Sequence, residues 1–73
     1  MFNLFDIVKL KSPKINLGIT SNDIGAIVYI HNDGEAYGEA YTVEFLDSDN
    51  ETIMESLFME FTPDELTLVK KDS

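Results

Sequence analysis

The apolar residues of this 73-residue chain come in short runs, and residues typical of turns separate them. Short runs that alternate in polarity, or that are rich in β-branched and aromatic side chains, indicate strands rather than helices. The predicted strands are residues 6–10, 24–31, 41–46, 52–61 and 66–69. We therefore expect an all-β fold of five strands.

Residues 52–61 are the ambiguous segment among these five. Their apolar positions also fit a helical spacing, whereas residues 52–54 indicate a strand. The length and the setting of the segment favour the strand. Beyond it, Thr62 and Pro63 followed by two acids form a helix-start pattern. Few residues remain before the next strand, so this pattern predicts a single 3₁₀ turn.

Two of the predicted strands indicate where the core lies. Apolar residues occupy both parities of residues 24–31, so both faces of that strand are expected to be covered. Gly25, near its start, suits a β-bulge that bends the strand. In residues 41–46, the side chains predicted to share one inward face are Tyr41, Val43 and Phe45.

The succession of these elements matches a small SH3-like barrel. It has five short strands, a long first loop over residues 11–22 and one short 3₁₀ turn near the C-terminus. We expect a single SH3-like domain over residues 1–73, because a chain of this size forms only one core.

Charge is distributed unevenly along the chain, whose formal net charge is −9. Residues 23–69 hold twelve carboxylates and no lysine or arginine, and the five lysines lie on either side of them. Nucleic acids and anionic membranes require a cationic face, so neither is expected as a partner. An acidic surface suits a basic partner protein or a cation, or it serves solubility alone.

The chain lacks residue types that disulfides and several kinds of binding site require. There is no cysteine and only one histidine, so neither a disulfide nor a Cys/His zinc site can form. The first residues lack the basic start and apolar stretch of a secretory signal, and no apolar run is long enough for a membrane span. We therefore expect a cytoplasmic protein.

Two patterns resemble catalytic or metal sites. His31, with Asp33 nearby and several serines in the chain, could supply a triad, but a solvated or hydrogen-bonded histidine is favoured at a strand end without a cleft. Residues 47–51 imitate the start of a calcium loop, yet Thr52 stands where glycine is needed and Phe58 where glutamate is needed. We predict no catalytic, cofactor-binding or metal-binding residues.

A tandem repeat follows a turn signal at residues 32–34. Residues 34–37 and 38–41 both have the sequence Gly-Glu-Ala-Tyr. Four added residues preserve the period-two register of the strand that follows. We therefore expect the second copy to supply Tyr41 to the core, and Tyr37 to lie in an extended hairpin.

A protein interface is the remaining kind of site. Exposed tyrosine beside carboxylates has the composition of a binding hot spot. Residues 52–61 hold more apolar side chains than one strand face buries, so part of them either forms an exposed patch or fills the core. The predicted partner-binding residues are Glu35, Tyr37, Glu39, Glu44, Phe58 and Met59.

An ordered set of motifs runs through the chain, formed by residues 4–8, 23–28, the Gly-Glu-Ala-Tyr repeat, 43–45 and 62–66. With these motifs the sequence resembles a family of small bacterial proteins catalogued as a domain of unknown function (family 4926). The resemblance implies an SH3-like barrel and no established activity. Family members look like the accessory or antidote halves of small two-gene modules.

Two asparagines depart from the pattern of that family. Asn22 and Asn50 stand where the family tends to have glycine. Asparagine replaces glycine best where φ is positive, so both turns are expected to keep their backbone.

These observations lead to a non-catalytic, acidic protein-interaction module. We expect an antitoxin-type or immunity-type inhibitor of a basic partner, such as a nuclease-type toxin. The alternative is an accessory or structural subunit that docks on an enzyme complex through an apolar patch at Phe58 and Met59. A homodimer through the same apolar segment is a third possibility. Salt separates the first two, because screening weakens charge-driven binding and has little effect on apolar docking.

Overall fold

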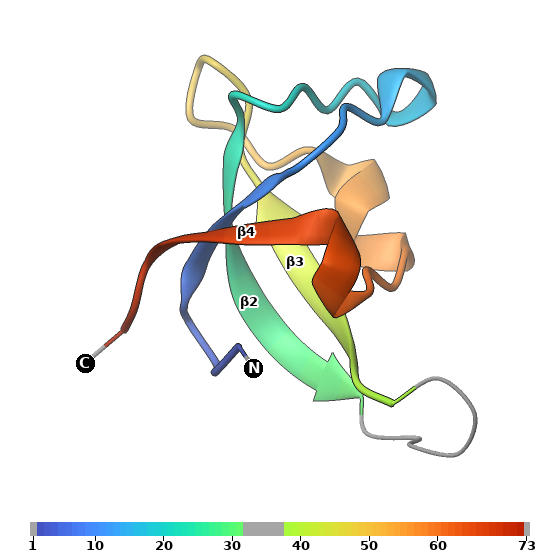
Figure 1. Ribbon diagram of the computed structural model, residues 1–73. Helices are drawn as coiled ribbons and strands as arrows, with labels where there is room; N and C mark the ends of the chain where they lie inside the picture. The colour runs from blue at the N-terminus through green and yellow to red at the C-terminus, as the bar shows by residue number, and fades with distance from the viewer. Residues whose placement is uncertain (1, 32–37, 73) are drawn as a thin grey trace.

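The computed structural model describes residues 2–31 and 38–72 of the chain (Figure 1). Its elements in order are β1 (Ile7–Leu10), η1 (Ile15–Leu17), β2 (Ile24–His31), β3 (Ala40–Phe45), η2 (Met54–Phe58), η3 (Pro63–Glu65) and β4 (Leu66–Lys70), where η marks a 3₁₀ turn. The strands form one antiparallel sheet in the order β3-β2-β1-β4. The expected all-β fold is confirmed.

The fifth predicted strand, over residues 52–61, is wrong. This segment contains η2, and only isolated bridges join its ends to the sheet, Thr52 to Leu46 and Phe61 to Tyr41. The hydroxyl of Ser56 donates to the carbonyl of Ile53 and holds the turn closed at 2.8 Å. The segment therefore forms a helical turn, as the spacing of its apolar residues indicates, and not the strand that its β-rich start indicates.

The five-stranded closed barrel is not observed either. The described residues form four strands in an open sheet, with β3 and β4 at its two edges. They also contain three 3₁₀ turns instead of the single one expected. The expected turn is among them, since η3 begins at Pro63 and the Glu65 carboxylate accepts the backbone N–H of Thr62 at 2.9 Å.

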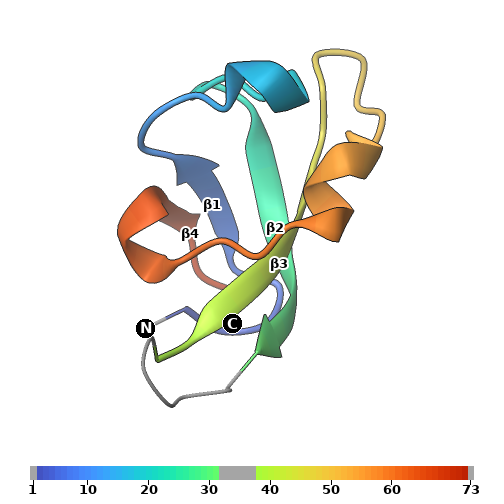
Figure 2. The ribbon, with the colours of Figure 1, turned by 90° about the vertical axis from the view of Figure 1, so that its right-hand side faces the viewer.

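The core lies between the sheet and the segment that carries η2 (Figure 2). Residues of β3 alternate between half-buried and buried, as the period-two pattern predicts. The fully buried apolar side chains are Val8, Leu10, Ile19, Ile27, Tyr41, Val43, Phe45, Phe61 and Leu66. Tyr41, Val43 and Phe45 are thus confirmed as core residues, and Phe45 meets Phe61 edge to face at 5.5 Å between ring centroids.

Gly25 has a different role from the one predicted. The register of β2 with β3 shifts between Ile27 and Tyr29, so the irregularity lies near Val28 and not at Gly25. A Cβ built on Gly25 would stand 2.7 Å from Cγ1 of Val43 and 3.0 Å from a carbonyl oxygen of β3. Glycine is needed there because β3 and its side chains approach too closely for any side chain.

The two asparagine turns behave differently. Asn50 has a φ of 64°, so it occupies the left-handed region as expected. Asn22 is not among the residues with positive φ, so the expectation for it is wrong. That turn is held by side chains instead. The carboxylate of Asp23 accepts the N–H of Thr20 at 2.8 Å, and the Thr20 hydroxyl accepts the N–H of Asn22 at 3.1 Å.

Candidate protein-binding surface

The outer face of the sheet carries an apolar area that the described part of the chain leaves open. Ile24 is 45 % exposed, and beside it lies a shallow hollow of about 90 Å³. We call this the outer hollow, and it is lined by Ile7, Ile24, Gly25, Ala26, Glu44 and Leu46. The prediction that both faces of β2 are covered is therefore wrong.

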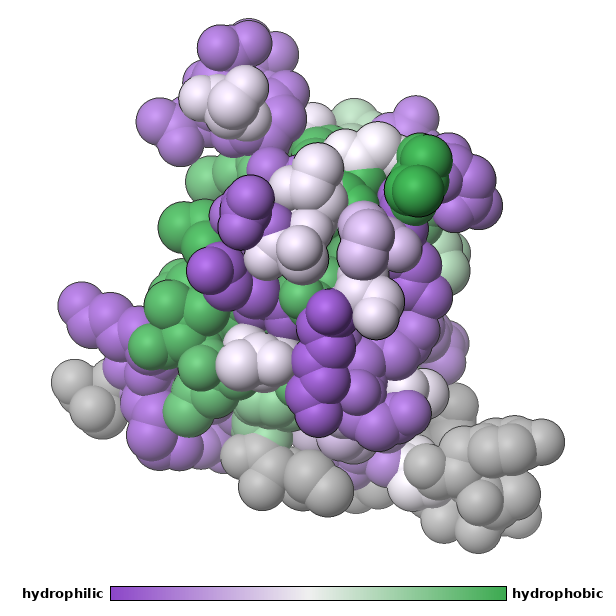
Figure 3. All heavy atoms as spheres, turned by 45° about the horizontal axis from the view of Figure 1, so that its top comes forward, coloured by the Kyte–Doolittle hydropathy of each residue, from purple (hydrophilic) through white to green (hydrophobic). Residues whose placement is uncertain are grey.

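The outer face is uncovered because residues 52–61 pack against the inner face of the sheet. Ile53, Met59 and Phe61 join the core on the inner face of the sheet, so this segment does not cover the outer face. Figure 3 shows one face of the molecule, on which hydrophobic side chains gather along one side and hydrophilic side chains cover most of the rest.

Glu44 places a carboxylate at the rim of the outer hollow. It lies on β3 opposite Ala26 of β2, half-buried, and its Oε2 accepts a hydrogen bond from the Thr52 hydroxyl at 2.6 Å. An ionised carboxylate has about four acceptor positions, so this bond orients Glu44 and leaves capacity for a donor from a partner. The predicted residue Glu44 is therefore positioned to contact a ligand next to apolar surface.

The turn after β3 adds further carboxylates. One oxygen of Asp47 accepts the backbone N–H groups of Asp49 and Glu51 at 2.8 and 3.0 Å, so Asp47 is used to hold the turn. The side chains of Asp49 and Glu51 are exposed. Residues 47–51, which we call the acidic turn, follow directly from Leu46 of the outer hollow and put negative charge beside it.

Glu39 has an internal partner. The hydroxyl of Tyr41 donates to Oε1 of Glu39 at 2.5 Å and accepts the backbone N–H of Phe2 at 3.4 Å. Burial, together with this bond to a carboxylate, raises the pKa of Tyr41. Glu39 thus satisfies a buried hydroxyl, which is a structural role. Glu35 and Tyr37, the other two predicted residues of the hairpin, lie outside the described residues.

Phe58 and Met59 are separated by burial although they are neighbours in the chain. Phe58, at the end of η2, is 83 % exposed, and Met54 on the same turn is also exposed. Met59 is half-buried and packs against the core. Residues 52–61 therefore form both an exposed patch and part of the core, because Phe58 lies on the surface and Phe61 is buried.

His31 lies among polar and aromatic neighbours at the end of β2. Its Nε2 is 2.7 Å from the hydroxyl of Thr42, its Nδ1 is 3.9 Å from the carboxylate of Glu60, and its ring meets Tyr29 edge to face. Asp33, the suggested triad partner, lies outside the described residues. Within residues 2–31 and 38–72, no group of three or more potential ligands could hold a metal ion.

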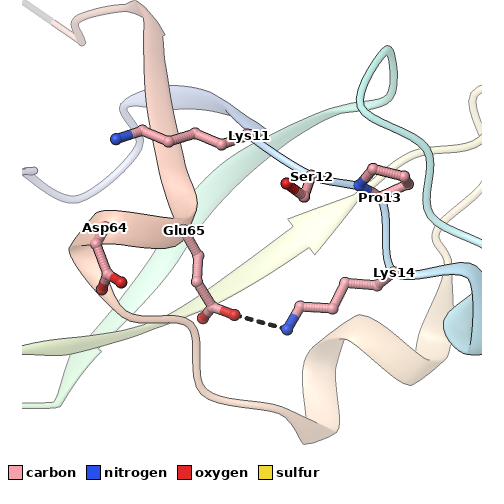
Figure 4. Close-up of a pocket in the computed structure, with 6 residues that line it drawn as sticks. All are labelled: Lys11, Ser12, Pro13, Lys14, Asp64 and Glu65. Atoms are coloured by element: carbon pink, nitrogen blue, oxygen red, sulfur yellow. Dashed lines mark hydrogen bonds and ion pairs between the residues drawn. The ribbon is translucent and has the colours of Figure 1, made fainter.

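The lysines lie on and beside β1 and β4, and Lys9 stands opposite Ile24 of the outer hollow. Lys9 and Lys70 lie on β1 and β4, and Lys11, Lys14 and Lys71 lie beside these strands. A second hollow of about 190 Å³ opens there, lined by Lys11, Ser12, Pro13, Lys14, Asp64 and Glu65. In Figure 4 the Lys14 ammonium points at the Glu65 carboxylate, 2.6 Å away, while Lys11 points away from that pair. The Lys14–Glu65 pair joins η3 to the first loop, and the two lysines and two acids of the lining balance, so this hollow presents little net charge.

The described residues include no helix long and apolar enough to cross a membrane.

The sequence model of a family described as "Domain of unknown function (DUF4926)" matches residues 4–66. The chain belongs to this family. The family resemblance expected from the motifs is thereby confirmed, and the DUF4926 match spans β1, β2, β3 and the segment to the first residue of β4. It includes the outer hollow and the acidic turn. Searches of curated proteins and of solved structures gave no significant match.

Sequence reasoning missed the apolar half of this surface. Ile7, Ile24 and Leu46 were not among the predicted partner-binding residues, yet they line the outer hollow next to Glu44. The signal was present in β2, whose apolar residues occupy both parities. A strand that is apolar on both faces needs two covers, and residues 2–31 and 38–72 cover only one of its faces.

Proposed function

We propose that this protein is a non-catalytic binding module that holds a partner protein with a basic surface against the outer face of its sheet. One observation carries the proposal. The outer hollow combines uncovered aliphatic side chains with the oriented carboxylate of Glu44 and the adjoining acidic turn. A binding hot spot has this composition, since an apolar anchor excludes water and charges at the rim select the partner.

The chemistry of the anchor follows from the lining. A lysine or arginine has an apolar stem and a cationic head, so its stem fits the aliphatic floor and its head reaches Glu44. Surrounding carboxylates would accelerate encounter with a basic partner more than they would strengthen the final complex. Inhibition of a basic enzyme, in the manner of an antitoxin or immunity protein, is the use of such a surface that we favour.

A pair of matched charge variants tests the proposal. Asp49→Asn with Glu51→Gln removes two carboxylates beside the outer hollow, and Glu55→Gln with Glu60→Gln removes two exposed carboxylates elsewhere. Tagged forms of both, and of the wild type, would be used to capture partners from native lysate at low and high salt. A captured basic protein would then be purified and its association rate measured. We expect the first pair to slow association about tenfold, and the second to change it much less.

A variant inside the hollow tests the apolar part. Ile24 is partly exposed on the outer face, so Ile24→Thr removes apolar contact with a partner while keeping a β-branched side chain in the strand. We expect faster dissociation with an unchanged association rate. Equal association and dissociation rates for all these variants and the wild type would refute the proposal.

A second function is favoured by a different observation, the exposure of Phe58 and Met54 on η2. In this alternative the protein is an accessory or structural subunit that docks on an enzyme complex through these side chains. Such binding would survive high salt and would be lost in Phe58→Ala, whereas the acidic-turn variants would bind normally.

We further propose that the fold is an incomplete SH3-like barrel. Phe61 bridges to Tyr41 at the β3 edge, and η3 then leads directly into β4 at the opposite edge of the sheet. The chain thus passes round the core from one edge to the other. An experimental structure with residues 59–62 hydrogen-bonded along β3 as a regular strand would support the barrel.

A further inference from the structure

The strand β4 is the exposed edge of the sheet. It is the last strand in the order β3-β2-β1-β4, and β1 is its one neighbour in the sheet. Only its first residue, Leu66, is buried, whereas Leu68 and Val69 are 40 % and 48 % exposed. An edge strand with apolar residues is a template for a further strand.

The register shows which backbone groups face outward. Thr67 lies opposite Lys9, and the N–H of Lys11 donates to the carbonyl of Glu65 at 2.9 Å. In an antiparallel pair, the residues that bond to a given neighbour alternate along the strand. Thr67 therefore directs its N–H and C=O toward β1, and Leu68 directs its own away from β1, to the open side.

The residues at the two ends of β4 have opposite charge. Asp64 and Glu65 precede the apolar residues 66–69, and Lys70 and Lys71 follow them. If two such strands run antiparallel, the acids of each lie beside the lysines of the other. Opposite charges across a strand pair stabilise it and like charges destabilise it, so this pattern is complementary to itself in the antiparallel orientation only.

We propose that a second copy of this chain docks edge to edge on β4, with the two strands antiparallel about a two-fold axis at Leu68. The N–H and C=O of Leu68 then bond to those of the Leu68 in the second copy, and the two sheets become one. Strands centred on Leu68 bring Lys71 opposite Glu65, and Asp64 then lies opposite Asp72 and diagonal to Lys70. Closed two-fold symmetry satisfies both copies with one contact.

The distribution of the remaining charge agrees with this arrangement. The exposed acids Asp49, Glu51, Glu55 and Glu60 belong to the segments that follow β3, the strand at the other edge of the sheet. Two chains with a net charge of −9 therefore meet at the edge where their lysines are gathered. The outer hollow stays open in both copies, so the dimer does not depend on the proposed function.

A charge exchange between the two ends of β4 tests the contact. Lys71→Glu and Glu65→Lys each place like charges directly opposite one another in the dimer, and the double variant restores opposite charges with their positions exchanged. Sedimentation equilibrium from micromolar to millimolar protein would give the dimer dissociation constant. We expect each single variant to weaken dimerisation about tenfold, and the double variant to return close to the wild type.

Glu55→Lys is the matched control for Glu65→Lys, since it makes the same change of charge away from the β4 edge. Thermal unfolding of each variant shows whether it is folded. Amide exchange supplies a second readout, because the Leu68 N–H should become more protected as the wild-type concentration rises. A monomer at every concentration would overturn the proposal. A dimer whose dissociation constant is unchanged by the charge exchange at β4, or is changed by Phe58→Ala instead, would also overturn the proposal.

Discussion

The two edges of the sheet are finished in different ways. At the β3 edge, Tyr41 exchanges both backbone hydrogen bonds with Phe61, and Phe45 bonds through its carbonyl to Ile53 and through its N–H to Ser56. At the β4 edge, the strand has no such cover among the described residues and is exposed beyond Leu66. One edge is therefore part of the core, and the other remains available to a partner.

The means of attachment differ as well. The segment over the β3 edge is held by backbone hydrogen bonds and by the buried ring of Phe61. β4 pairs with β1 along its length, and near its ends charged side chains also fasten it, Lys14 to Glu65 before it and Asp6 to the N–H of Asp72 after it. Damage at the β3 edge should therefore cost more stability, whereas the β4 edge should respond more to pH and salt.

The largest effect is expected from Phe61→Ala. The ring is fully buried against Phe45, so its removal leaves a cavity and should cost about 3–5 kcal/mol. That approaches the whole stability of a domain of this size, so the variant should be largely unfolded. Urea unfolding followed by circular dichroism measures it.

Phe58→Ala is the matched control for Phe61→Ala, because it deletes the same atoms at an exposed position of the same segment. Its unfolding free energy should stay within about 0.5 kcal/mol of the wild type. Similar losses in the two variants would contradict the division of this segment into a surface and a core residue.

A smaller loss is expected from Ser56→Ala at the same edge. The buried hydroxyl of Ser56 accepts the N–H of Phe45 at 3.2 Å and donates to the carbonyl of Ile53. Its removal leaves the N–H of Phe45 buried without this acceptor, at a cost of about 1–3 kcal/mol. Ser48→Ala, at an exposed serine of the acidic turn, is the control and should be nearly neutral. If the two variants have the same urea midpoint, Ser56 does not hold the cover of the β3 edge.

At the β4 edge, Asp6→Asn should produce a loss that depends on pH. The backbone N–H groups of Asp72 and Asn3 donate to the Asp6 carboxylate and hold its pKa below the ordinary value. A lowered pKa means that the charged form stabilises the fold. Its contribution is complete above the unfolded pKa of about 3.9, and it is lost as the pH falls through the folded pKa.

The measurement is the urea midpoint of wild type and Asp6→Asn between neutral and acid pH. The gap between the two proteins should be widest near pH 7 and should narrow at the most acid pH. Asp49→Asn, with the same change of charge at an exposed site, should show a smaller gap. A constant gap across the whole range would show that Asp6 acts without its charge.

The smallest effect is expected from Lys14→Gln. The ion pair with Glu65 is short, at 2.6 Å, but both side chains are partly exposed, so its loss should cost less than about 1 kcal/mol. Partial burial raises the pKa of Glu65, but the hydrogen bond and charge of Lys14 together with the hydrogen bonds from Thr62 outweigh it, so the pKa is lowered overall. Thermal unfolding at low and high salt should show a difference that shrinks with salt, and Lys9→Gln is the control. A larger loss than that of Ser56→Ala would reverse the order of the two edges.

The ranges of the strands could be predicted because their signals are local. β1, β2, β3 and β4 each begin within one residue of the predicted start, and the Thr62-Pro63 pattern located η3. Alternation along β3 also identified Tyr41, Val43 and Phe45 as core, because side chains two apart in a strand share a face wherever the strand lies. Glu44 was selected for a different reason, as one of the carboxylates of the acidic stretch over residues 23–69.

Other properties depended on contacts between distant segments. The sequence left open whether the apolar side chains of residues 52–61 form a surface patch or fill the core, and the bridge from Phe61 to Tyr41 decided which of the two phenylalanine rings is buried. The sequence predicted a β-bulge at Gly25, whereas the structure shows that glycine is needed there because β3 lies too close for a Cβ. The outer hollow could not be predicted, because its side chains come from β1, β2 and β3 and its exposure depends on where residues 52–61 pack.

The sequence by itself therefore determined the four strands and η3, the net charge and the family, since these depend on neighbouring residues, composition and ordered motifs. The tertiary structure decided which edge of the sheet is covered, which sheet face stays open and how the charges are grouped. The lysines come from both ends of the chain, and they gather on one edge only because β1 pairs with β4. The physical reason is that strand pairing joins residues some sixty positions apart in the chain, a relation that no local pattern contains.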